Sequence, residues 1–125
     1  MYGWILNSDK FRPNDGAYTE IIHTNAGVNG YLGTLGHADF YPNGGVNMPG
    51  CGGSMTCDHH RAFHYMAESL RTGGFTGRRC LTYITAMTQT CGLPGTLNMG
   101  GLVPKFGSRG IFWLQTNRNP PFSRG

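Results

Sequence analysis

The segment from Gly36 to Ala62 constrains the fold of this chain more than any other part. Residues 38–41 form a short run of strand-forming character, and the following Pro42-Asn43-Gly44-Gly45 is typical of a tight turn. Cys51 and Cys57 then bracket residues 52–56, and His59 follows the second cysteine by two positions. A histidine beside a closed loop is restricted in orientation, which is what proton transfer requires.

Hydrophobic patterning predicts the other elements. Tyr18–Thr24 is rich in β-branched residues without clean alternation, which is typical of a strand covered on both faces. A helix is expected from about His60 to Leu70, capped by Asp58 and ended by Gly73-Gly74. Further expectations are a strand or short helix at Tyr83–Met87, irregular chain at Gly92–Gly110 and a buried strand at Ile111–Leu114.

Composition narrows the class of protein. The chain has 125 residues, 21 of them glycine, which predicts one loop-rich domain or part of one. The formal net charge is +4, yet no run of five like charges occurs, so nucleic acid is not expected as a partner. No apolar run approaches the length of a membrane span, and no basic leader or signal peptide precedes the first apolar residues.

The four cysteines form two local pairs along the chain. Short loops are the easiest to close, so pairing of Cys51 with Cys57 and of Cys80 with Cys91 is favoured among the three possible pairings. Disulfides indicate an oxidising compartment. An alternative is a zinc module in which Cys51 and Cys57 act with His60 and His64, two histidines four residues apart on one helix face.

The five histidines are not equivalent. His23, His37 and His64 are expected to be structural or solvated, and His60 is unassigned. His59 is the candidate general base, although no serine nucleophile is found: the G-x-S-x-G elbow is absent, and Gly52-Gly-Ser54-Met-Thr56 only approximates it.

Several longer motifs resemble the animal neutral lipases, the pancreatic-lipase and phospholipase A1 family. They are Ile22-His-Thr-Asn25, the Gly36–Gly45 segment, Pro49-Gly-Cys51, Cys57-x-His59-x-Arg61-Ala62, Ala67-Glu-Ser69 and Gly110-Ile-Phe-Trp-Leu114-x-Thr-Asn117. The resemblance covers the chain from about Asn7 onward and is closest to invertebrate members.

The resemblance implies an α/β fold, here the C-terminal fragment of an α/β-hydrolase fold with a few mostly parallel strands, one clear helix and many loops. It places the family's catalytic histidine on His59 and supports the Cys80–Cys91 disulfide. It implies that the loop between Cys51 and Cys57 is the family's lid over the acyl groove, formed here by Gly52, Gly53, Ser54, Met55 and Thr56.

The same resemblance implies what this sequence lacks. The family's serine elbow, oxyanion loop and Leu-Asp-Pro-Ala aspartate motif have no counterpart in residues 1–125, which correspond to the last third of the catalytic domain without the C-terminal lipid-binding sandwich. Asp15 aligns with a calcium-binding position of vertebrate relatives, but Arg12 stands at the neighbouring ligand position, so no metal or cofactor is expected.

The expected function is therefore that of a fragment of a secreted, extracellular carboxylic ester hydrolase that acts on triacylglycerol or phospholipid. Transient contact with a lipid surface is expected for the whole enzyme. Since the serine and the aspartate of the catalytic triad are missing, the chain alone is expected to be inactive. The alternative is a non-catalytic, lipase-derived binding or yolk-storage protein.

Overall fold

The computed structural model describes the backbone of residues 4–6 and the backbone and side chains of residues 18–25, 36–103 and 105–125. Its elements in chain order are β1 (Trp4–Leu6), β2 (Glu20–Ile22), β3 (Ala38–Pro42), α1 (Met55–Thr72), β4 (Phe75–Cys80), α2 (Tyr83–Met87), β5 (Thr96–Met99) and β6 (Gly110–Leu114). Asp15 and Arg12, at the positions that the resemblance compares with calcium ligands, lie outside the described residues.

The six strands form one mixed sheet in the order β1-β2-β3-β6-β4-β5. The centre is parallel: β3 runs parallel to both β2 and β6, with Ile21 opposite Asp39 and Phe40 opposite Phe112. Both flanks are antiparallel, through the β1–β2 pair on one side and the β6–β4 and β4–β5 pairs on the other. The predicted α/β class is confirmed, and the expected parallel pairing describes the centre of the sheet.

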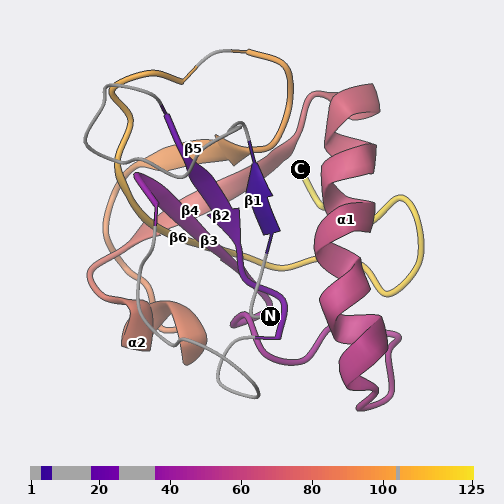
Figure 1. The fold of residues 1–125 in the computed structure, drawn as a ribbon. Coiled ribbons are helices and arrows are strands. Elements are labelled where there is room, and N and C mark those ends of the chain that lie inside the picture. Colours follow the sequence, from indigo (N-terminus) through magenta and orange to yellow (C-terminus); the bar gives the residue numbers. More distant parts are fainter. Residues whose placement is uncertain (1–3, 7–17, 26–35, 104) are drawn as a thin grey trace.

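The two helices cover opposite faces of the sheet (Figure 1). On the face covered by α1, Phe40 of β3 stacks on Phe112 of β6 with ring centroids 5.2 Å apart. Both rings belong to a cluster that includes Ala62 and Tyr65 of the helix. On the other face, Tyr41 lies in a smaller cluster with α2. Neighbouring residues of β3 therefore bury into different layers, as the period of two in a strand requires.

Helix α1 starts five residues earlier than the sequence predicted, at Met55. Its cap is Ser54, whose hydroxyl accepts the amide of Cys57, so the predicted cap at Asp58 is wrong. A serine that accepts the amide three residues on is a standard helix start, but the Cys51–Cys57 pair made this stretch resemble a loop. Gly73 ends the helix with φ 95°, as predicted.

The long irregular stretch expected after Gly92 contains strand β5, and residues 75–80 form the unpredicted strand β4. Tyr83–Met87 is a helix, capped by Thr82. Along β4, buried Phe75, Gly77 and Cys80 are interrupted by the exposed Thr76 and Arg78. This alternation carries too few apolar side chains to indicate a strand from sequence. The strand is stabilised by pairing with β6 rather than by the β propensity of its own residues.

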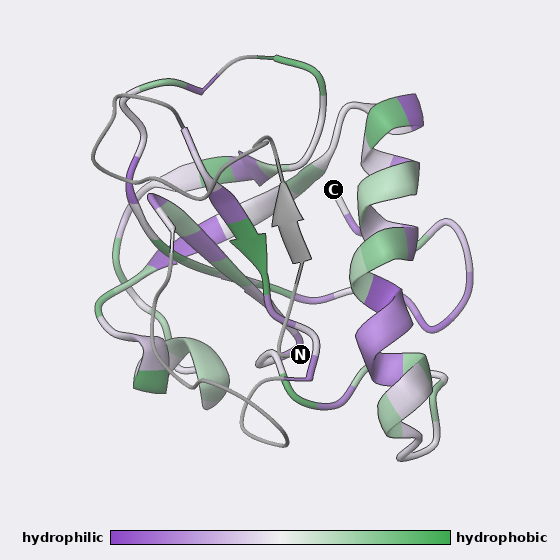
Figure 2. Cartoon of the chain, viewed as in Figure 1, coloured by the Kyte–Doolittle hydropathy of each residue, from purple (hydrophilic) through white to green (hydrophobic). Residues whose placement is uncertain are grey.

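Colouring by hydropathy shows a hydrophilic band across α1 after a paler first turn, and alternating apolar and hydrophilic residues in the rest of the helix (Figure 2). No helix within the described ranges combines the length and the apolar character needed to cross a bilayer.

Candidate functional site around His59

The first turn of α1 is fixed covalently and by a cap. The Cys51–Cys57 disulfide joins the chain before the helix to its third residue, and the Cys80–Cys91 disulfide closes the β4–α2 connection. Both predicted pairings are confirmed. No cysteine is free, so the zinc module that needs Cys51 and Cys57 as thiolate ligands is wrong.

Two further contacts anchor this turn to the sheet. The buried carboxylate of Asp58 accepts the backbone amide of Met48 at 2.7 Å. The hydroxyl of Thr24, which follows β2, donates to the backbone carbonyl of His59 at 3.4 Å. These contacts and the disulfide hold the backbone of His59 against the parallel strands. A general base must be held close to the proton that it accepts, so a fixed backbone suits that role.

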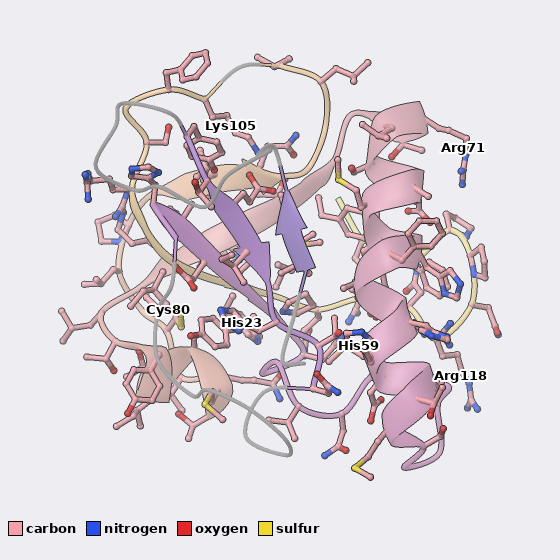
Figure 3. The ribbon with its side chains drawn as sticks, in the orientation of Figure 1. His23, His59, Arg71, Cys80, Lys105 and Arg118 are labelled. Carbon is pink, nitrogen blue, oxygen red and sulfur yellow. A yellow bond between two sulfur atoms is a disulfide. The ribbon has the colours of Figure 1, made fainter. Side chains whose placement is uncertain are left out.

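The imidazole of His59 is partly exposed and lies on the side of α1 that faces the sheet (Figure 3). Its Nδ1 is buried and has no hydrogen-bond partner in the described part of the chain. Burial, and then the nearby His60 at 6.0 Å between ring centroids, lower the pKa of His59 below its ordinary value of 6.5. The neutral imidazole that a general base must present is thus favoured at neutral pH.

The described carboxylates are all engaged by other groups. Asp39 pairs with Nε2 of His23 at 2.7 Å, and Glu20 pairs with Lys105 at 2.5 Å. Glu68 accepts the amides of Phe122 and Ser123. With Asp58 bound to Met48, none of these four is hydrogen-bonded to His59. No carboxylate in the described part of the chain is therefore hydrogen-bonded to Nδ1 of His59.

A second orphan polar atom lies one residue from the Thr24 contact. The side-chain Oδ1 of Asn25 is buried and has no hydrogen-bond partner within the described ranges. Residue patterns gave no role to Asn25 beyond its place in the Ile22–Asn25 motif, because a buried amide after a strand carries no distinctive spacing.

The expected lid, residues 52–56, is only partly a loop. Gly52, Gly53 and Ser54 are exposed and precede the helix, whereas Met55 and Thr56 belong to the first turn of α1. The non-helical part between the cysteines is therefore residues 52–54. Ser54 uses its hydroxyl as the helix cap, and no described serine hydroxyl bonds to His59.

The remaining histidines lie as follows. His23 is fully buried, bonds to Asp39 and stacks on Tyr41 at 4.3 Å, and His37 accepts the amide of Thr19 at 2.9 Å. His60 and His64 are exposed on α1. His23 and His37 are thus structural, as predicted.

A cavity of about 310 Å³ lies beside the second half of α1, away from His59. Its polar groups, Glu20 and Lys105, are paired with each other, and Lys105 also donates to the carbonyls of Asn98 and Gly100. This cavity therefore offers no free acid or base. Within the described ranges, no three metal-ligating side chains lie close enough to share an ion.

Comparison with known proteins identifies the family of this chain. A family model described as Lipase matches residues 5–122. Pancreatic lipase-related protein 2 of Cavia porcellus is 31% identical over 90% of this chain and 29% of its own length. Lipase member H of Danio rerio is 31% identical over 93% of this chain and 30% of its own length. Pancreatic triacylglycerol lipase of Myocastor coypus is 31% identical over 90% of this chain and 32% of its own length. The chain spans about a third of the length of these relatives.

Proposed function

Because this chain belongs to the lipase family, we propose that it is the histidine-bearing part of the catalytic domain of a carboxylic ester hydrolase, and that residues 1–125 are a C-terminal fragment of that domain. The proposal rests chiefly on the buried Nδ1 of His59, which meets no acceptor within the described ranges. In a serine hydrolase that nitrogen donates to a buried carboxylate, which holds the other nitrogen toward the serine. A buried ring nitrogen without a partner at this place fits a carboxylate supplied by a further segment.

In the proposed reaction, a serine hydroxyl outside residues 1–125 attacks the ester carbonyl. His59 accepts the hydroxyl proton as the new carbon–oxygen bond forms and returns it to the leaving alcohol, whose bond to the acyl carbon breaks. Water then attacks the acyl-enzyme and gives its proton to the same imidazole, and the serine recovers it as the acid leaves. The lowered pKa of His59 keeps it ready to accept the first proton.

The substrate class proposed is a triacylglycerol or a phospholipid. Two relatives are named pancreatic triacylglycerol lipase and pancreatic lipase-related protein 2. The short lid, of which residues 52–54 are the only non-helical part between the cysteines, supports a site that needs little rearrangement to admit a lipid. Any contact with a lipid surface is accordingly proposed to be transient.

Secretion is part of the same proposal. Two disulfides in a chain with no free cysteine fit an extracellular, oxidising environment.

A chimera tests the proposed role of His59. The segment from Tyr18 onward replaces the corresponding part of a pancreatic triacylglycerol lipase that contributes the serine and the aspartate, and hydrolysis of a short-chain ester and of a triacylglycerol emulsion is measured. The expected result is turnover that falls by about 10³-fold or more in His59→Ala, because a triad member is lost. Arg71→Ala, on the exposed side of the last turn of α1, is the matched control and is expected to keep full activity.

The 125-residue chain alone is expected to release no product. Turnover by the chain alone that disappears in His59→Ala would contradict the need for an external serine. A folded chimera that forms no acyl-enzyme and hydrolyses neither ester would favour the non-catalytic binding or storage protein instead.

A further inference from the structure

The exposed side of α1 carries two histidines that the proposed hydrolase chemistry does not use. His60 and His64 are four residues apart, at the sixth and tenth positions of an 18-residue helix, and both are exposed. Neither ring forms a hydrogen bond within the described ranges; their only ring contacts are with His59, Phe63 and Phe122. We propose that His60 and His64 together bind one divalent transition-metal ion, such as Ni²⁺, Cu²⁺ or Zn²⁺, on the outer face of the helix.

Helix geometry brings the two imidazoles into range. Residues four apart on a helix have Cβ atoms about 5–6 Å from one another, which lets both rings reach one ion at about 2.0–2.1 Å. The turn that carries them is rigid, because Ala62 and Tyr65 on the opposite side are fully buried. The ligands are thus presented by a fixed backbone, and only side-chain rotation is needed to close on the ion.

The charges nearby decide which ions fit. The guanidinium of Arg61 lies 4.8 Å from the centre of the Phe122 ring, on which His64 also stacks at 6.4 Å. One positive charge is therefore close to the site. The nearest acidic residues on the helix, Asp58 and Glu68, are buried and accept backbone amides, so neither faces the two histidines.

A site of two imidazoles without a carboxylate selects against hard cations. Ca²⁺ and Mg²⁺ need several oxygen ligands, whereas imidazole suits Zn²⁺, Cu²⁺ and Ni²⁺. Since no third protein ligand is close by in the described part of the chain, water must fill the remaining positions. The two-histidine site is therefore expected to be open to exchange and weaker than a three-ligand centre.

Calorimetric titration of the 125-residue chain with NiCl₂ and with ZnCl₂ at pH 7.5 tests the proposal. One ion per chain is expected to bind, with no competition from a hundredfold excess of Mg²⁺ or Ca²⁺. Because a chelate needs both rings, His60→Ala and His64→Ala are each expected to weaken binding at least tenfold, and the double variant to weaken it little further. His60→Gln and His64→Gln repeat the test with longer polar side chains.

A spacing control separates a chelate from independent histidines. The double variant His64→Ala/Arg71→His keeps the number of histidines on α1 but places the second one three turns from His60, and is expected to stay as weak as His64→Ala. Circular dichroism establishes that each variant keeps its helix. No binding by the wild-type chain at millimolar Ni²⁺, loss of less than tenfold in both single variants, or recovery in the spacing control would overturn the site.

Discussion

Glu68 is expected to hold the C-terminal segment onto α1. Its carboxylate is 3% exposed and accepts two backbone amides, from Phe122 at 2.7 Å and from Ser123 at 2.8 Å. Phe122 is buried against Tyr65, with ring centroids 5.3 Å apart. The two bonds therefore fix a core side chain as well as the backbone beside it.

The stability that Glu68 contributes can be estimated from its two hydrogen bonds. A hydrogen bond to a charged group contributes about 1.5–3 kcal/mol, and replacing the acceptor leaves its donors unsatisfied. Two such bonds suggest about 3–6 kcal/mol, which we lower to about 2–4 kcal/mol because Ser123 is half-buried and water can reach its amide. Glu68→Ala is expected to reduce the free energy of unfolding by that amount, out of about 5–15 kcal/mol for a typical domain.

Urea unfolding followed by tryptophan fluorescence measures the loss, and hydrogen exchange of the Phe122 and Ser123 amides locates it. Glu68→Gln keeps the side-chain length but offers one acceptor oxygen, so it is expected to recover less than half of the lost stability. Arg71→Ala, an exposed neighbour, is the control and is expected to change stability by less than about 0.5 kcal/mol. Unchanged exchange at both amides in Glu68→Ala, together with wild-type stability, would refute the reasoning.

Two further predictions concern His59 and the sheet. In an NMR titration of the chain, the His59 imidazole is expected to titrate below its ordinary pKa of 6.5, because burial disfavours its charged form. The unfolded chain then binds more protons, so His59 contributes to a loss of stability as the pH falls from 6.5 through its lower folded pKa; a midpoint above 6.5 would contradict this. Gly77→Ala places a methyl group 2.9 Å from the Phe40 ring and 3.1 Å from Cβ of Phe112, so overpacking is expected to reduce the free energy of unfolding by about 1–3 kcal/mol. Thermal unfolding measures this loss, and a variant as stable as the wild type would show that Phe40 and Phe112 move aside freely.

The sequence predicted the parts whose signals are local. The helix end at Gly73, the strand ending in Pro42 and the short closed loops of both disulfides depend on residues close together in the chain. The start of α1 was misplaced because Ser54, a good cap, lies between two cysteines that suggested a loop.

The rest depends on contacts between distant segments. Strand β5 (Thr96–Met99) has only Met99 fully buried, so its pairing with β4 gives no apolar pattern to read. The candidate site was predicted as far as His59, but its anchors were not. The bond from the Met48 amide to Asp58 and the contact from Thr24 to the His59 carbonyl join residues 10 and 35 positions apart, and neither leaves a spacing signal.

The hydrogen bond between His23 and Asp39 has a consequence for how the parallel strands align. These residues come from neighbouring strand segments, with Ile21 opposite Asp39, and both are at most 1% exposed. A shift of β2 by a single residue would turn His23 to the other face of the sheet. The carboxylate of Asp39 would then be left without this partner in a buried place. A shift of β2 by one residue is therefore penalised by the loss of this hydrogen bond.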